Sequence, residues 1–255
     1  MSDLQESLGM IPDKQTNVDI VFVIDVTRSM DPIIDMVKRT ALSFRDLLEE
    51  KLKSSHHVIN NLRIKVIWFR DFYYDGNQAY GESDFFELPE QKEDFHKYVE
   101  SLEAKGGGDL PESSLEALTM AMRSDFVQTG DSRRHIIALF TDDGAHPLED
   151  YDKLVEEAAK ESCRPTMYPD NMPKDIEEFY RMWQKKDEET QEALGVSNLD
   201  PKGRRLVLFA PDAYPWNDLE TDLEYVFRKP IEAGQGGKDL VSDDMAAMLA
   251  YSYAE

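Results

Sequence analysis

Two apolar runs in this sequence end in oxygen-bearing side chains. The run Val-Asp-Ile-Val-Phe-Val-Ile-Asp ends at Asp25, and Thr27 and Ser29 follow at intervals of two residues. A second apolar run ends at Asp142. Carboxylate and hydroxyl oxygens close together suit a hard cation such as Mg²⁺, which keeps several waters and needs few protein ligands. The spacing therefore predicts a magnesium site, with Mn²⁺ or Ca²⁺ as alternative ions.

Both runs have the composition of strands that are buried on both faces of a parallel sheet. Residues 31–52 follow the first run and repeat apolar positions at helical spacing, which predicts a helix. In open α/β sheets, ligands gather outside the carboxyl ends of the strands. We therefore expect Asp25 and Asp142 to lie beside each other at that edge.

The remaining pattern alternates strands with helices. The segment 85–88 is expected to pair antiparallel with a strand at 62–69, as an edge strand would. Together the elements predict an α/β fold: a Rossmann-like, mainly parallel twisted sheet with one antiparallel edge strand and helices on both faces. The other expected strands lie at 134–142, 204–210 and 223–227, and the other helices at 94–104, 111–123 and 241–253.

One domain fits the chain better than two. Residues 1–17 are expected to form an N-terminal extension, and residues 18–255 a single domain. The segment at about 149–200 is acidic, largely helical and longer than an ordinary crossover needs to be. We interpret it as an insertion or an elaborated crossover.

Composition excludes several classes of function. The 29 basic and 52 acidic residues give a net charge of −23, which disfavours nucleic acid and anionic membrane surfaces as partners. The single cysteine, Cys163, rules out an internal disulfide or a thiolate cluster, and the scattered histidines disfavour zinc. The first residues lack the basic and apolar regions of a secretory signal. A cytoplasmic location is the expectation.

Four segments in order resemble the von Willebrand factor A domain family. The first, Asp25-x-Thr27-x-Ser29, is similar to the metal-ion-dependent adhesion site of that family. Intracellular members, including those linked to alpha-type protein kinases, carry segments like the other three. These are Phe69-Arg-Asp-Phe72, Gly106-Gly-Gly-Asp-Leu-Pro-Glu112 and Phe140-Thr-Asp-Asp-Gly-Ala-His-Pro147. The resemblance covers roughly residues 18–147 and continues more weakly beyond.

The resemblance implies that Asp25, Thr27, Ser29 and Asp142 are ligands, directly or through water. Most members supply a threonine from the middle loop, where this chain has acids. Either Asp109 or Glu112 could take the place of that threonine as a ligand, and the choice between them is open.

Two further acids have less defined roles. Asp71 either supports the ligands or ends a strand in a turn. Asp143 is either an acceptor behind the ligands or the next turn residue.

The function implied by the resemblance is binding rather than catalysis. A carboxylate of a partner protein would complete the coordination of the cation, so that recognition depends on the metal. The chain would then act as an adaptor or regulatory subunit inside a cell, with another protein as its partner.

Three alternatives remain open. Asp25 and Asp142 also resemble motifs of haloacid-dehalogenase-like phosphatases, with Asp25 as nucleophile, although Thr27 stands where that family has a second acid. A scaffold with a vestigial metal site could instead bind through residues 149–192. The third alternative is purely structural: Asp25, Thr27 and Ser29 would cap a helix, and Asp142 and Asp143 would form a turn before Gly144.

Overall fold

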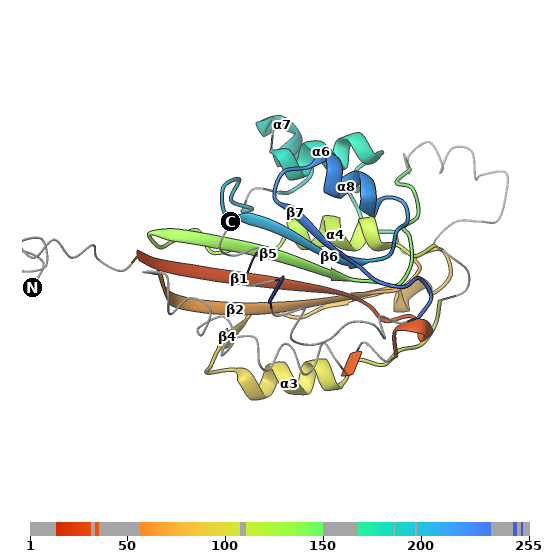
Figure 1. Ribbon diagram of the computed structural model, residues 1–255, viewed down its shortest axis with the longest axis horizontal. Helices are drawn as coiled ribbons and strands as arrows, with labels where there is room; N and C mark the ends of the chain where they lie inside the picture. Colours follow the sequence, from red (N-terminus) through yellow and green to blue (C-terminus); the bar gives the residue numbers. More distant parts are fainter. Residues whose placement is uncertain are drawn as a thin grey trace, which may run out of the picture.

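The computed structural model describes most of the chain (Figure 1). The described residues are 14–31, 34–35, 57–107, 111–149, 168–185, 187–196, 198–235, 247–248 and 251. The predicted helices at 31–52 and 241–253 lie almost entirely outside these ranges, and so does Asp109.

A seven-stranded mixed sheet forms the centre of the molecule. Its order is β3-β2-β1-β5-β6-β7, and β4 also pairs with β2. The pairs among β2, β1, β5, β6 and β7 are parallel. The strands are β1 (Lys14–Asp25), β2 (His57–Phe69), β3 (Tyr80–Glu82), β4 (Phe86–Leu88), β5 (Ser132–Phe140), β6 (Arg204–Ala210) and β7 (Val226–Pro230).

The predicted α/β fold is confirmed, with differences in detail. The antiparallel edge consists of two short strands, β3 and β4, which both pair with β2. A three-residue strand containing Gly81 is too short to show a period-2 pattern, so β3 was not predicted. β1 begins at Lys14 rather than Val18 and takes in part of the segment expected to precede the domain.

Helices cover both faces of the sheet, with α3 on one face and α4, α6 and α8 on the other (Figure 1). α4 begins at Ser114 rather than 111, because Glu112 forms a strand-like bridge with Ala145 instead of a helical turn. α8 was not predicted. The helices are α3 (Lys92–Glu100), α4 (Ser114–Met122), α6 (Ile176–Gln184), α7 (Glu188–Ala193) and α8 (Trp216–Asp222).

Two apolar cores sandwich the sheet. Alternate residues of β1 face opposite cores: Phe22 belongs to the core that includes α3, and Val23 to the core that includes α4, α6 and α8. In the second core, Trp183 of α6 and Trp216 of α8 are fully buried. The predicted 149–200 segment thus contributes α6 to the crossover between β5 and β6, and a buried apolar face anchors that helix.

The candidate site lies where the central strands end. β1 is paired with β2 on one side and β5 on the other, so connections diverge there to the two faces of the sheet. The register pairs Asp25 with Phe69, and Ile24 with Phe140. Asp25 and Asp142 therefore reach the same edge. Among the described helices, none has the length and apolar character needed to cross a bilayer.

Candidate metal centre

Two hydrogen bonds and one close contact between hydroxyls join four of the predicted ligands. The Thr27 hydroxyl donates to Asp25 Oδ1 over 2.6 Å and lies 3.3 Å from the Ser29 hydroxyl. Ser29 Oγ donates to Asp142 Oδ1 over 2.9 Å. The loop after β1 and the loop after β5 are thus joined through side-chain oxygens. These are the oxygen types that a hard cation prefers.

Asp25 is enclosed by protein. It is fully buried, and Oδ1 also accepts from the Thr27 amide over 2.8 Å. Its other oxygen, Oδ2, accepts from the hydroxyl of Thr141 over 2.9 Å. Thr141 is a member of the site that sequence reasoning missed, although its position between β5 and Asp142 could have suggested it.

The electrostatics at Asp25 are unfavourable for a bare carboxylate. The pKa of Asp25 is raised to about 7. Burial is the main cause and the negative charge of Asp142 adds to it, whereas the hydrogen bonds from Thr27 oppose the increase. All the donors to Asp25 named above are neutral. A bound divalent cation would supply the missing positive charge.

Glu112 lies beside this cluster. A Cβ built on Gly107 would come within 3.1 Å of both Glu112 Oε1 and the Thr27 side chain, so Gly107 separates the two at close range. Glu112 is 2% exposed, and its Oε2 has no hydrogen-bond partner. Burial, followed by the charges of Asp25 and Asp71, raises its pKa to about 9. A buried acid with an unpartnered oxygen fits a cation ligand.

The middle loop is fixed from two sides. The Glu112 carbonyl accepts from His146 N over 3.0 Å, which ties the loop to the segment after β5. The Gly107 amide donates to Asp75 Oδ2 over 3.1 Å, and Gly107 has a φ of 73°, a conformation that favours glycine. Asp75 was not predicted, because nothing in its local sequence marks it.

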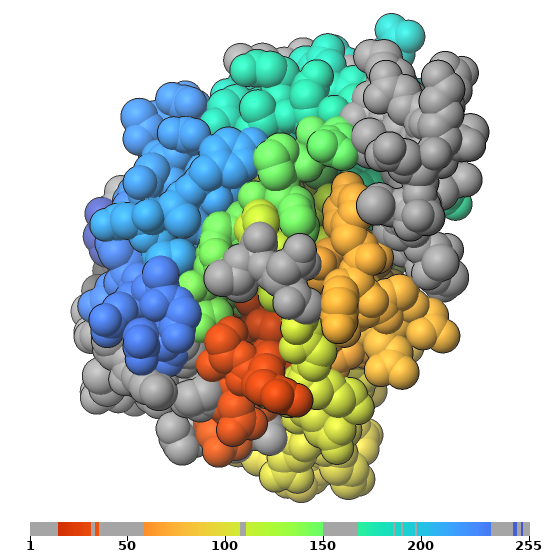
Figure 2. Space-filling view, turned by 90° about the vertical axis from the view of Figure 1, so that its right-hand side faces the viewer, coloured from red at the N-terminus to blue at the C-terminus, as the bar shows by residue number. Residues whose placement is uncertain are grey.

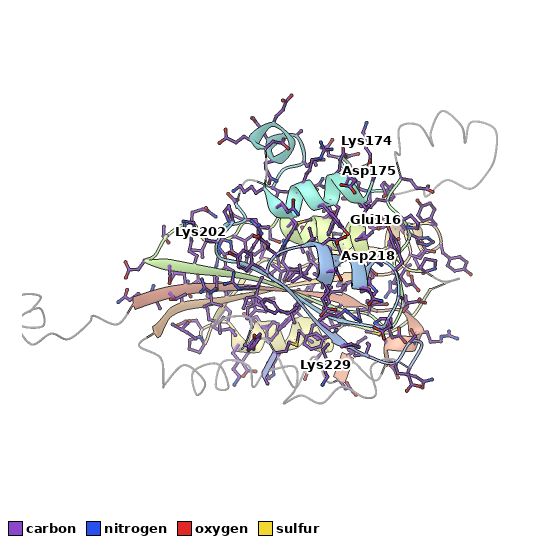
Figure 3. The ribbon with its side chains drawn as sticks, turned by 45° about the horizontal axis from the view of Figure 1, so that its top comes forward. Glu116, Lys174, Asp175, Lys202, Asp218 and Lys229 are labelled. Atoms are coloured by element: carbon purple, nitrogen blue, oxygen red, sulfur yellow. The ribbon has the colours of Figure 1, made fainter. Side chains whose placement is uncertain are left out.

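A second group of buried acids lies behind the cluster. Asp71 is fully buried; its Oδ1 accepts from the Tyr73 amide over 2.7 Å and lies 3.7 Å from His146 Nε2, while Oδ2 is unpartnered. Glu116 comes from α4 (Figure 3), is fully buried and accepts from the Tyr168 hydroxyl over 2.7 Å. Burial raises the pKa of Glu116 to about 7. Among the described residues, no hydrogen bond joins Asp71 to Asp25, and Asp71 acts on Glu112 through its charge.

Asp143 has a local structural role. Its Oδ1 accepts from the Gly144 amide over 2.6 Å, and its carbonyl accepts from Trp216 Nε1 over 2.8 Å. Burial raises the pKa of Asp143, and Asp142 adds to this effect. The contacts match the turn interpretation, and they anchor the segment after β5 to α8.

The carboxylates of this site are too few to hold a cation alone, so hydroxyl groups or water would have to complete the coordination. Among the described residues, no three acidic, histidine or cysteine side chains gather as one cation site. A metal bound here would therefore use the hydroxyls of Thr27 and Ser29 in addition to the carboxylates of Asp25 and Asp142. Such a set suits Mg²⁺, which tolerates a partial protein shell completed by water.

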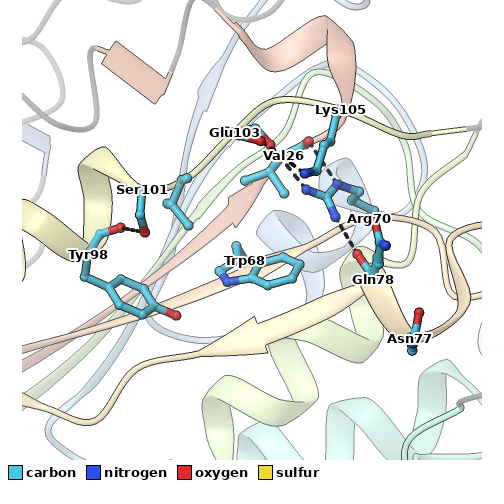
Figure 4. A pocket seen from close by; sticks show the side chains of 10 residues that line it. Val26, Trp68, Arg70, Asn77, Gln78, Tyr98, Ser101, Glu103 and Lys105 are labelled. Carbon is cyan, nitrogen blue, oxygen red and sulfur yellow. Dashed lines mark hydrogen bonds and ion pairs between the residues drawn. The ribbon is translucent and has the colours of Figure 1, made fainter.

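A cavity of about 340 Å³ opens next to the metal loop, between α3 and the β2–β3 edge (Figure 4). Val26 and Lys105 line it, and the Trp68 ring forms part of its wall. Arg70 closes one side, because its guanidinium donates to the carbonyls of Val26, Gln78 and Glu103. These contacts fix the segments that carry Asp25 and Gly106.

Two sequence comparisons match part of this chain. A family model described as the von Willebrand factor A domain matches residues 85–192. The alpha-protein kinase vwkA of Dictyostelium discoideum is 30% identical over 95 residues, which cover 37% of this chain and 14% of that protein. The matched part is thus a small fraction of the relative's length.

Solved structures share the fold. The PilB minor pilin of Streptococcus sanguinis gives a TM-score of 0.51 at 16% identity, covering 96% of this chain and 64% of that one. The pilus adhesin SpaC of Lactobacillus rhamnosus GG, in its open conformation, gives 0.50 at 13% identity, covering 94% and 31%. At such identities the likeness concerns the fold alone. The family model and the sequence relative, which each match less than half of this chain, support a von Willebrand factor A domain within it.

Proposed function

We propose that this chain binds a partner protein through a Mg²⁺ ion held at the carboxyl end of the sheet. Asp25, Thr27, Ser29 and Asp142 would hold the ion, directly or through water, with Mn²⁺ or Ca²⁺ as substitutes. The observation that carries the proposal is the continuous chain of oxygens from Asp25 through Thr27 and Ser29 to Asp142. The match of residues 85–192 to the von Willebrand factor A domain model supports it.

The bound cation would supply a positive charge at the carboxyl end of the sheet, where the surrounding side chains are acidic. The hydrogen bonds from Thr27 to Asp25 and from Ser29 to Asp142 would orient the oxygens that hold the ion. Ser29 is exposed, so the open side of the site faces solvent there. A partner carboxylate reaching this side would complete the coordination.

Glu112 offers an additional ligand in place of the threonine that most members of the family carry. Its unpartnered, buried Oε2 supports this role. A second acid near the ion would strengthen cation binding and leave less positive charge for the partner. The alternative ligand, Asp109, lies outside the described residues.

The geometry favours binding over phosphoryl transfer. A nucleophilic aspartate needs an accessible oxygen, whereas Asp25 is fully buried and both of its oxygens accept hydrogen bonds. Thr27 occupies the position where a phosphatase of the haloacid-dehalogenase type would need an acid. We therefore propose that the chain is not an enzyme.

We extend the proposal to an adaptor or regulatory role inside a cell. The resemblance to intracellular members and the single cysteine support this location. A sequence relative that is named a kinase suits a domain that brings an enzyme to its partner. The 149–200 segment contributes α6 to the core, which favours a structural role for that helix over independent binding.

The test is affinity capture from a native extract with four baits. Wild type and Ser29→Ala are each used with Mg²⁺ and with a chelator. A partner retained only by wild type with Mg²⁺ supports the proposal, because Ser29 links the two ligand loops. Capture that ignores both the metal and Ser29 would refute it, and a phosphatase assay would be the next measurement.

A further inference from the structure

Exposed aromatic side chains gather on the loops around the metal centre. Among the described residues, the exposed large hydrophobic side chains are all tyrosines. Three of them follow the carboxyl ends of strands: Tyr73 and Tyr74 after β2, and Tyr214 after β6. Isolated exposed tyrosines need no explanation, but a group of them beside a candidate site does.

The tyrosines flank the loop that carries Asp142. The Tyr73 ring lies 5.1 Å from the His146 ring, and the Tyr214 carbonyl accepts from the Ala145 amide over 3.0 Å. Figure 2 views this end of the molecule, with the segment after β2 and the segment after β6 on opposite sides of the segment after β5. Tyrosines thus lie on two sides of the loop that carries Asp142.

Of the three, Tyr73 is held in place by its neighbours. Tyr73 N donates to the buried Asp71 carboxylate over 2.7 Å, which fixes the loop after β2. The Tyr73 ring also lies 6.3 Å from the Tyr168 ring, which the hydrogen bond to buried Glu116 holds in place. Ordered tyrosines lose little conformational entropy on binding and often dominate interfaces.

Carboxylate side chains lie near these tyrosine rings. Besides burial, the negative charge of Asp218 raises the pKa of Tyr214, and that of Glu149 contributes to the raised pKa of Tyr168. Asp218 and Glu149 are both exposed. An aromatic face beside a carboxylate is the surface that an arginine or lysine side chain matches, through cation–π contact and charge.

We infer that the partner segment is basic and carries one acidic residue, which binds the cation while flanking arginine or lysine side chains lie on Tyr73, Tyr74 and Tyr214. This inference rests on the proposed function and names the chemistry of its partner. The net charge of −23 would draw a cationic segment toward the molecule, whereas a uniformly acidic segment would be repelled everywhere except at the ion.

The test is selection from a random dodecapeptide library displayed on phage. The immobilised full chain is loaded with Mg²⁺, and bound phage are eluted with a chelator. Selected peptides are then measured by fluorescence anisotropy against wild type, the triple variant Tyr73→Ser/Tyr74→Ser/Tyr214→Ser, and Tyr251→Ser as a matched control. Tyr251 is also an exposed tyrosine, but its ring lies against Phe227 of β7. Thermal shift with Mg²⁺ reports cation binding separately.

We expect peptides with an aspartate or glutamate flanked by arginine or lysine. The triple variant should bind them about tenfold more weakly, with an unchanged Mg²⁺ shift, while Tyr251→Ser binds normally. Acidic or purely apolar peptides, or equal binding to the triple variant, would overturn the inference, as would a Mg²⁺ shift without chelator-eluted peptides. Absence of any Mg²⁺ shift would instead refute the proposed function, and the inference with it.

Discussion

β1 (Lys14–Asp25) buries two aspartates in different ways, Asp19 in the middle of the strand and Asp25 at its carboxyl end. Asp19 and Asp25 are both fully buried. Asp19 accepts two hydrogen bonds from the Arg63 guanidinium, at 2.8 and 2.6 Å, and one from the Val127 amide at 2.6 Å. Asp25 accepts only from neutral groups, those of Thr27 and Thr141. One carboxylate has its counterion within the protein, and the other lacks one.

The contrast extends across the sheet. At the amino end, hydrogen bonds from Arg133 and two backbone amides outweigh burial and lower the pKa of Asp200 to about 2. At the carboxyl end, Asp71, Glu112 and Glu116 each keep a buried oxygen without a partner. The amino end thus stabilises the fold, whereas the carboxyl end concentrates negative charge that a cation would neutralise.

The largest predicted effect is a difference in sign between the two aspartates. Arg63→Met should lower the free energy of unfolding by about 3 kcal/mol, because it leaves Asp19 buried without its counterion. Asp25→Asn in chelator at pH 8 should raise it, on the order of 1 kcal/mol, because a buried charge is removed. Urea denaturation measures both. Destabilisation by Asp25→Asn in chelator would show that the two aspartates do not differ as described.

The second prediction concerns pH. Asp25 and Glu116 have pKa values raised to about 7 and Glu112 to about 9, so the folded state binds more protons than the unfolded state. Stability in chelator should therefore fall as pH rises from about 4 to about 9, by several kcal/mol.

Saturating Mg²⁺ should flatten that pH dependence, because the ion replaces the protons. Chemical denaturation across this pH range, with Mg²⁺ and with chelator, is the measurement. Parallel curves in the two conditions would mean that no cation binds to these acids.

The third prediction decides between the two candidate ligands of the middle loop. Glu112→Gln resembles the protonated acid, so stability in chelator at pH 7.5 should change by less than about 0.5 kcal/mol. If Glu112 is a ligand, the affinity for Mg²⁺ should fall about tenfold. Asp109→Asn is the matched control and should leave the affinity unchanged. The reverse result would assign the ligand to Asp109.

The smallest effect is expected at the amino end. His135 is buried and stacked on Phe126; its Nε2 bonds the Val127 carbonyl, and its Nδ1 accepts from the Asp200 amide. Burial lowers its pKa, so the unfolded state binds its proton first as the solution is acidified. Stability should fall by about 1 kcal/mol below pH 6.5.

This loss should be independent of Mg²⁺, in contrast to the effect at the carboxyl end. His135→Gln should flatten the acid limb of the stability curve. If the loss of stability at acid pH depended on Mg²⁺, it would arise from the acids of the metal centre and not from His135.

The metal loop could be predicted from sequence because its parts are local or follow a general rule. Asp25, Thr27 and Ser29 lie on one short stretch of chain, and Asp142 follows from the alignment of parallel strand ends. The apolar runs of β1, β5 and β6 identified the central sheet for the same reason.

Features that depend on tertiary contacts could not be predicted. Glu112 lies outside α4 because it pairs with Ala145, a contact distant in sequence. Glu116 looks like an ordinary helix residue until Tyr168 and the core enclose it. The counterion of Asp19 depends on the register of β1 with β2, in which Asp19 is opposite Arg63. No pattern near any of these residues encodes its partner.

The most direct test of the central claim is isothermal titration calorimetry of Mg²⁺ into the chain at pH 7.5, in two buffers that differ in ionisation enthalpy. We expect one bound ion for wild type, with release of protons from the buried acids, and an affinity at least about tenfold weaker for Ser29→Ala. Absence of binding by wild type, or equal binding by Ser29→Ala without proton release, would contradict it.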